Sequence, residues 1–143
     1  MEHILKLKNK VTEINLLPSY VNTIGKILDI SPEDCEQLNL VLEEAVSNVI
    51  SYAYPKEEEH MFEIRAICEE RQLTLSVIDD GVPFDPTEHT MPDTTLLMEE
   101  RDIGGLGIFL IHQMMDRVWY RRENGKNILT MCKNYGAKGL WKS

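Results

Sequence analysis

The chain has 143 residues, the length of one domain, and 43% of them are apolar, as is typical of a globular protein. Its net charge of −9 argues against nucleic acid and anionic membrane surfaces as binding partners. The charge is uneven, because residues 31–102 hold nineteen acidic and four basic side chains. The first residues alternate charged and apolar types where a signal peptide would be apolar, and no apolar run is long enough to span a membrane. We therefore expect one cytoplasmic domain over residues 1–143.

The N-terminal part of the chain predicts a strand followed by two helices. Residues 3–14 carry apolar residues among polar ones, as at the edge of a sheet, and residues 18–29 predict a short helix. A longer helix begins after Ser31, whose hydroxyl precedes Pro32 and two acidic residues, a combination typical of helix N-termini. This helix ends before Pro55, because a proline disfavours helical backbone at the residue before it.

The remaining strands form two predicted hairpins. Strand-like runs at residues 61–68 and 73–78 are joined by a polar turn. Runs at residues 118–122 and 127–133 flank Asn124-Gly125, a dipeptide that strongly favours a tight hairpin turn.

Between these hairpins, residues 87–103 lack periodicity and predict a lid or a disordered loop, and a helix follows that ends near Arg117. Residues 136–143 predict a loosely ordered tail. The order of elements favours an α+β fold with two layers, in which a mixed, mostly antiparallel sheet carries helices on one face.

Glu44 and Asn48 are the first candidate ligand-binding pair. They lie one turn apart on the long helix, so that their side-chain oxygens can face one ligand. On a helical wheel both also fall on the polar arc, so a solvated helix face remains the alternative.

Acidic residues follow the strand at residues 73–78. In Asp79-Asp80-Gly81, a carboxylate at the end of a strand can accept a donor from a ligand, and a glycine allows close approach to the backbone. An ordinary acidic turn is the alternative. Asp85 precedes Pro86 and can equally accept hydrogen bonds from the amides of its own loop.

The motif Gly104-Gly105-Leu106-Gly107 opens the helix after the predicted lid. Free backbone N–H groups and the positive end of the helix dipole suit a phosphate there. The motif is not a Walker loop, because no Gly-Lys-Ser/Thr follows, nor a dinucleotide fingerprint, because Leu110 stands in place of the third glycine. A flexible entry into the helix is the alternative.

In this order and spacing, the three motifs resemble the Bergerat-type ATP-binding domain shared by gyrase, histidine kinases and mismatch-repair ATPases. The sequence is most similar to the bacterial anti-sigma-factor serine/threonine kinases, over about residues 10–135. A histidine kinase is disfavoured because 143 residues leave no room for its dimerising helical hairpin, and a gyrase-type ATPase because its transducer domain is missing.

The resemblance implies a role for each motif. Asn48 would bind the magnesium ion that bridges the ATP phosphates, and Glu44 would be the general base. Asp79 would accept a hydrogen bond from the adenine amine, and Gly81 would keep the base-binding turn open. The lid at residues 87–103 would close over the phosphates, and the remaining nucleotide-binding residues would be Asp85, Gly104, Gly105, Leu106 and Gly107.

The activity implied is transfer of the ATP γ-phosphate to a serine or threonine of an anti-anti-sigma-factor (STAS-type) protein, with a sigma factor bound in another state. Two positions depart from relatives: Pro83 stands where many have glycine, and Ile103 where some anti-sigma kinases have a basic residue. Arg101 is either a substitute for that base or a solvated charge. An ATP-gated protein-binding module without phosphotransfer is the alternative function, and a domain that binds no nucleotide is a third. Whether the protein forms a homodimer is left open.

Overall fold

Five strands form one sheet in the computed structural model, which describes residues 1–88 and 103–136 except for the side chains of residues 103–106. The strand order is β1-β2-β3-β5-β4, and all four pairings are antiparallel. The predicted α+β class is thus confirmed, and the described sheet is antiparallel throughout rather than mixed. The strands are β1 (Glu2–Lys8), β2 (Met61–Glu69), β3 (Gln72–Asp79), β4 (Arg117–Glu123) and β5 (Lys126–Asn134).

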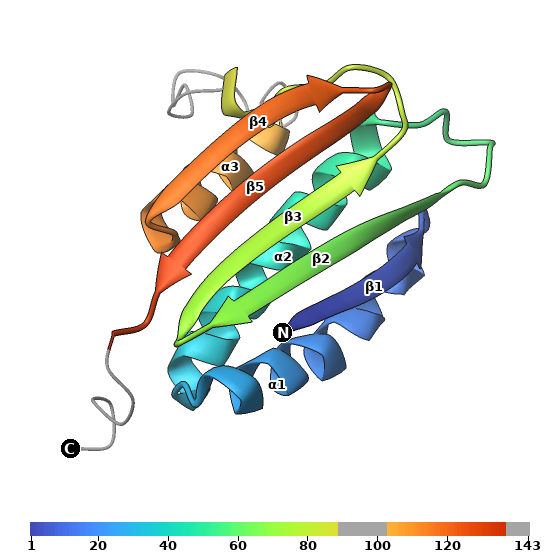
Figure 1. Ribbon diagram of the computed structural model, residues 1–143. Helices are drawn as coiled ribbons and strands as arrows, with labels where there is room; N and C mark the ends of the chain where they lie inside the picture. Colours follow the sequence, from blue (N-terminus) through green and yellow to red (C-terminus); the bar gives the residue numbers. More distant parts are fainter. Residues whose placement is uncertain (89–102, 137–143) are drawn as a thin grey trace.

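Three α-helices lie on one face of this sheet, as Figure 1 shows, with α2 behind the central strands. The opposite face carries no helix within residues 1–88 and 103–136. The helical elements are α1 (Leu17–Leu28), α2 (Pro32–Tyr52), α3 (Ile103–Met114) and the short 3-10 helices η1 (Val11–Leu16) and η2 (Pro86–Glu88).

The helix boundaries follow from local sequence signals. The backbone N–H of Asp34 donates to Ser31 Oγ at 3.0 Å, so the predicted cap of α2 is present. The predicted helix at residues 18–29 is confirmed as α1, which ends at Leu28 and is followed by Asp29 in a left-handed conformation (φ 54°). The predicted strand at residues 3–14 is shorter than expected, because β1 ends at Lys8 and η1 follows.

The hydrophobic core lies between the sheet and the helices. Burial alternates along β3, so Leu73, Leu75 and Val77 face the helices. They belong to one cluster with Leu42 of α2 and Ile108 of α3. This one-sided core places the α2 surface next to the ends of β3 and β5, where the candidate site lies.

Both hairpin turns use left-handed backbone. Asn124 and Gly125 have φ of 53° and 75°, as the Asn-Gly signal predicts. Glu70 and Arg71 have φ of 48° and 67°. Side chains of these two types rarely adopt positive φ, so the sequence predicts the first hairpin but not its turn geometry.

Parts of the sequence predictions fall outside the described residues. These are residues 89–102 of the predicted lid and all of the predicted tail except Gly136.

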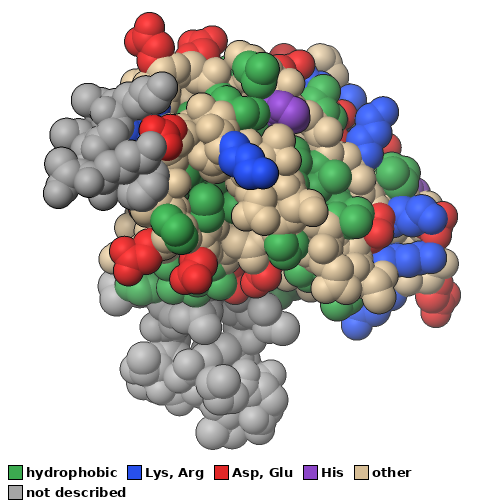
Figure 2. Space-filling model, turned by 90° about the horizontal axis from the view of Figure 1, so that it is seen from below, with side chains coloured by type: hydrophobic (Ala, Val, Ile, Leu, Met, Phe, Trp, Pro, Cys, Tyr) green, Lys and Arg blue, Asp and Glu red, His purple; other side chains and the backbone are tan. Residues whose placement is uncertain are grey.

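Seen from below, the surface shows charged side chains of both signs interspersed with small groups of apolar ones (Figure 2). Among the helices that the structure describes, none is both long and apolar enough to cross a membrane.

Candidate functional site

A buried cavity lies where the end of β3 and the start of β5 meet the second half of α2. Asn48 and Asp79, predicted separately from the sequence, both line it. Its volume is about 20 Å³, room for about one water molecule, so the walls must part to admit a nucleoside. The other lining residues are Ala45, Val49, Ala53, Val77, Phe84, Pro86, Tyr120, Asn127 and Leu129.

Asn48 is buried. The alternative prediction, a solvated position on the polar arc of the helix, is therefore wrong for this residue. Its exposed fraction is 4%, and its Nδ2 atom has no hydrogen-bond partner among the described residues. A buried amide donor without a partner is costly and uncommon in native proteins. A polar ligand at this position would remove that cost.

Glu44 lies one turn before Asn48 and faces α3. A Cβ atom on Gly107 would lie 2.5 Å from Glu44 Oε2, so a glycine is needed for this close approach. Burial, followed by the neighbouring carboxylate of Glu43, raises the pKa of Glu44. The structure thus brings the glutamate of one predicted motif against the glycine motif of another.

The glycine motif forms the start of α3, which begins at Ile103. The first four backbone N–H groups of a helix have no partner within the helix, so α3 itself does not use those at its start, and the predicted binding of phosphate there stays a prediction. The side chain of Leu106 lies outside the described part of the structure.

Asp79 is the buried acid at the end of β3, with an exposed fraction of 5%. Its Oδ1 atom accepts hydrogen bonds from the backbone N–H of Gly81 at 2.9 Å and from Asn127 Nδ2 at 2.8 Å. Burial raises the pKa of Asp79, and these two hydrogen bonds oppose the rise. The carboxylate is therefore held in a fixed position at the cavity wall.

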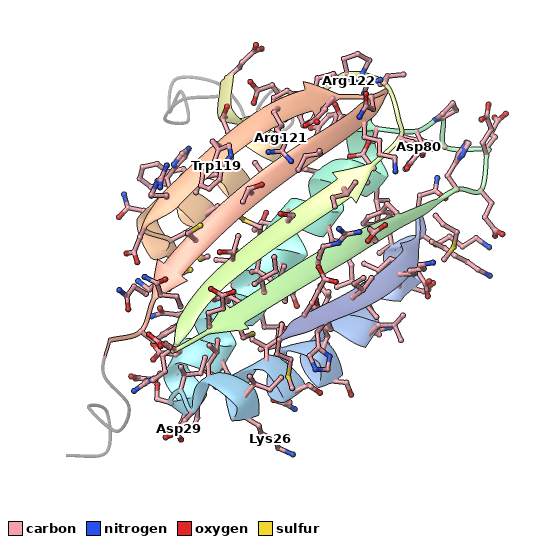
Figure 3. The ribbon with its side chains drawn as sticks, viewed as in Figure 1. Lys26, Asp29, Asp80, Trp119, Arg121 and Arg122 are labelled. Carbon is pink, nitrogen blue, oxygen red and sulfur yellow. The ribbon has the colours of Figure 1, made fainter. Side chains whose placement is uncertain are left out.

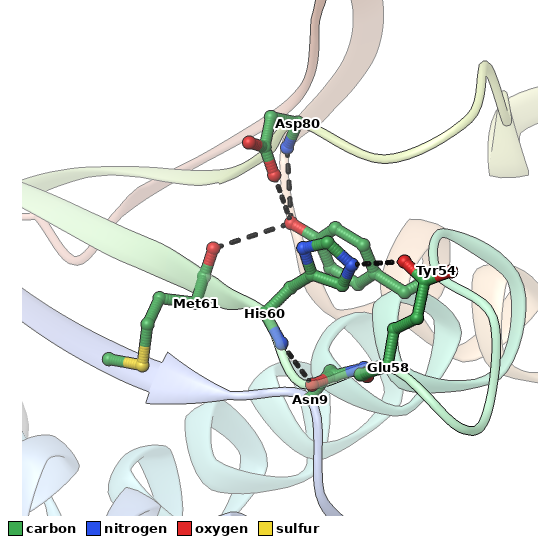
Figure 4. A network of polar contacts seen from close by, with 6 residues as sticks. All are labelled: Asn9, Tyr54, Glu58, His60, Met61 and Asp80. Carbon is green, nitrogen blue, oxygen red and sulfur yellow. Dashed lines mark hydrogen bonds and ion pairs between the residues drawn. The ribbon is translucent and has the colours of Figure 1, made fainter.

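Asp80, the next residue, belongs to a separate network that ties the α2–β2 connection to the end of β3 (Figure 4). The Tyr54 hydroxyl donates to Asp80 Oδ1 at 2.7 Å and accepts from the Asp80 backbone N–H at 3.1 Å. The Tyr54 ring stacks on His60, whose backbone N–H donates to Asn9 Oδ1 at 2.8 Å. Of the two adjacent acids, only Asp79 lines the cavity.

Gly81 packs against the end of α2. A Cβ atom at Gly81 would overlap the backbone carbonyl of Ala53, and the N–H of Val82 donates to that same carbonyl oxygen at 2.8 Å. Gly81 therefore allows the backbone of Ala53 to approach the turn closely.

Asp85 has a local partner. Its Oδ1 atom accepts from the backbone N–H of Thr87 at 2.8 Å and from the Thr87 hydroxyl at 2.5 Å, which fixes the start of η2. It is absent from the residues that line the cavity, whereas its neighbours Phe84 and Pro86 are present. Phe84 stacks on Tyr52 of α2, with ring centroids 4.7 Å apart.

Sequence reasoning missed Asn127, Tyr120 and Arg122. Asn127 is 4% exposed and accepts hydrogen bonds from Tyr120 Oη and Arg122 Nη1. A signal was available, because Asn127 shares its face of β5 with Leu129 and Met131, and a polar residue at an inward position needs partners.

The described residues contain no group of three or more His, Cys, Asp or Glu that could hold a metal ion by itself. A magnesium ion commonly takes one or two protein ligands and completes its shell with water and substrate phosphates. A lone asparagine such as Asn48 suits such shared binding.

Comparison with known proteins identifies the family. The family model of the histidine kinase-like ATPase domain matches residues 8–133. The anti-sigma F factor of Caldanaerobacter subterraneus is 29% identical over 133 residues, which cover 92% of this chain and 91% of the relative. The serine-protein kinase RsbW of Listeria monocytogenes is 28% identical over 129 residues, 87% and 82% of the two chains. The serine/threonine-protein kinase BtrW of Bordetella bronchiseptica is 28% identical over 97 residues, 68% of each chain. Because the family model spans most of the sequence, this protein belongs to the histidine kinase-like ATPase domain family.

Proposed function

We propose that this protein is a MgATP-dependent serine/threonine kinase of the anti-sigma-factor type. Its substrate is a serine or threonine of an anti-anti-sigma-factor (STAS-type) protein, and this phosphorylation regulates how much sigma factor is available. The observation that carries the proposal is that Asn48 and Asp79 line one cavity while Glu44, one turn before Asn48, lies against Gly107. The relatives named as anti-sigma F factor and serine-protein kinase support the same conclusion.

The adenine binds at the Asp79 end of the cavity. The Asp79 carboxylate accepts a hydrogen bond from the exocyclic amine of adenine. Guanine carries a carbonyl in that place, which would leave a buried carboxylate oxygen facing another acceptor. Such a mismatch gives a large preference for adenine, because an unpaired buried polar group is costly.

The phosphates bind between Asn48 and the start of α3. A magnesium ion shared with the phosphates would take the Oδ1 atom of Asn48 as its ligand. The buried, unpartnered Nδ2 atom is a donor and fits a phosphate oxygen or a phosphate-bound water. A bound magnesium ion neutralises phosphate charge. The backbone N–H groups at the start of α3 supply further donors. This arrangement lets a site within the most acidic part of the sequence receive a polyanion through magnesium and backbone N–H groups.

Glu44 is the general base for the transfer. It accepts the proton of the substrate hydroxyl as the hydroxyl oxygen forms a bond to the γ-phosphorus. The bond from that phosphorus to the β–γ bridging oxygen breaks, and ADP leaves. A carboxylate whose pKa is raised by burial accepts a proton more readily near neutral pH than an exposed one.

The deciding experiment compares Glu44→Gln with the wild type, using labelled ATP and a STAS-type anti-anti-sigma-factor protein as the substrate. We expect the variant to lose about 10²–10⁴-fold in transfer rate, while its MgADP affinity stays within about twofold of the wild type. Glu36→Gln is the matched control, because it makes the same change at an exposed position of the same helix. It should leave both quantities unchanged.

Three outcomes would contradict parts of this proposal. Equal transfer by wild type and Glu44→Gln would exclude Glu44 as the base. Nucleotide binding without any transfer would favour the ATP-gated binding module. Nucleotide affinity that survives EDTA unchanged would contradict the magnesium requirement.

A further inference from the structure

Asn127 connects three parts of the nucleotide end of the molecule. It lies at the start of β5, directly opposite Asp79 in the β3–β5 register. Its Nδ2 atom donates to Asp79 Oδ1 and to the backbone carbonyl oxygen of Val82, both at 2.8 Å. Its Oδ1 atom accepts from Tyr120 Oη at 2.5 Å and Arg122 Nη1 at 3.1 Å on β4.

The orientation of the Asn127 amide is fixed by its neighbours. A backbone carbonyl and a carboxylate oxygen surround Nδ2, and both are acceptors. The backbone N–H of Phe84, at 3.3 Å, and the Arg122 guanidinium surround Oδ1, and both are donors. A flipped amide would place its oxygen against two acceptors, so one orientation alone satisfies the network.

Arg122 strengthens this arrangement from the end of β4. Its Nη1 atom donates to the carbonyl oxygen of Gly81 at 2.8 Å as well as to Asn127. Figure 3 shows Arg122 at the same end of the sheet as Asp80, the residue before Gly81. The turn after β3 is therefore held from β4 and β5 together.

The consequence for Asp79 is that its two oxygens differ. Both of its donors, Gly81 N–H and Asn127 Nδ2, reach Oδ1. No donor from the described residues reaches Oδ2, which leaves this oxygen as the acceptor for a ligand. Without the Asn127 amide, the Gly81 N–H would be the one donor left to Oδ1, and the carboxylate could rotate about its χ2 angle away from the orientation that directs an oxygen to the cavity.

We propose that Asn127 is the positioning residue for adenine selection, because it holds Asp79 with Oδ2 directed to the exocyclic amine and, through the backbone of Val82 and Phe84, holds in place the segment that brings Phe84 to the cavity wall. The inference rests on the proposed function, in which Asp79 receives the adenine. It assigns selectivity to a side chain that does not itself contact the base.

The test compares the affinities of ADP and purine riboside diphosphate, which lacks the exocyclic amine, in the presence of Mg²⁺. In the wild type we expect ADP to bind about 10- to 100-fold more tightly, the strength of one hydrogen bond to a charged group. In Asn127→Ala this ratio should fall to below about threefold, mainly because ADP binds less tightly. Asn134→Ala, at the exposed end of the same strand, is the matched control and should keep the wild-type ratio.

Asn127→Asp is a second variant, which keeps the shape of the side chain but replaces the donor by an acceptor beside Asp79. It should lose the preference for ADP as well, and circular dichroism confirms that each variant is folded. An equal loss of affinity for both nucleotides, with the ratio unchanged, would make Asn127 a purely structural residue and overturn the inference alone. A wild type that binds neither nucleotide would overturn the proposed function and the inference together.

Discussion

Replacing Gly81 by alanine tests how tightly the turn after β3 is packed against α2. The added Cβ would overlap the carbonyl of Ala53, and overpacking of this kind costs about 1–3 kcal/mol. If the turn moves away, the hydrogen bond from Val82 N–H to Ala53 O is also lost, at a net cost of about 1 kcal/mol. Together these effects lower the free energy of unfolding by about 2–4 kcal/mol, which corresponds to a fall of roughly 10 °C in Tm.

Thermal and urea denaturation followed by circular dichroism measure this change. Gly125→Ala is an informative comparison, because Gly125 has a positive φ of 75° and open space around its Cα. Its cost is conformational, about 1 kcal/mol. Gly81 is not among the residues of positive φ, so its cost comes from contact alone. A Gly81→Ala variant as stable as Gly125→Ala, or more so, would refute the reasoning.

Three further variants probe neighbouring parts of the site. Burial raises the pKa of Asp79 in the folded state above 3.8, the pKa of an unperturbed aspartate. As the pH rises above 3.8, ionisation of this carboxyl therefore favours the unfolded state and lowers the stability of the folded protein. Asp79→Asn should therefore unfold at higher urea concentration than the wild type at pH 7 but not at pH 3.5, and a less stable variant at pH 7 would contradict this. Gly107→Ala should displace Glu44 and reduce phosphotransfer on the order of 10²-fold; an equal loss of MgADP affinity would show that the damage is to binding instead. Tyr54→Phe removes two hydrogen bonds to Asp80 and should cost about 1–2 kcal/mol in urea denaturation, with ADP affinity unchanged; a large loss of affinity would place Asp80 in the site after all.

The parts of the fold that local signals dictate were predictable. Ser31 and Pro32 mark the start of α2, and Asn124-Gly125 marks the turn between β4 and β5, because each signal acts within a few residues. The burial of Asn48 could not be settled from the helix alone. A helical wheel separates apolar from polar positions, but α2 packs against α3 as well as the sheet, so part of its polar arc is covered.

Local reasoning could identify Asn127 as a polar residue at an inward position of β5, but it could not identify the partners of its side chain. Its partners come from β3, from the turn after β3 and from β4, and the register that unites them is a property of the folded sheet. The motif Asp79-Asp80-Gly81 likewise indicates an acid at the end of a strand without choosing between the two acids. That choice follows from strand alternation, which turns Asp79 inward, and from the Tyr54 hydroxyl, which engages Asp80.

The pairing of β3 with β5 also governs when the candidate site can form during folding. Asp79 and Asn127 are neighbours across the sheet but lie 48 positions apart in the chain, and α3 and β4 lie between them. Closing so long a loop carries an entropic cost that is recovered once β5 docks on β3. During synthesis, the first three strands and two helices emerge well before β5. If the nucleotide binds as proposed, it therefore binds only chains in which β5 is in place, and it stabilises that state over intermediates that lack β5.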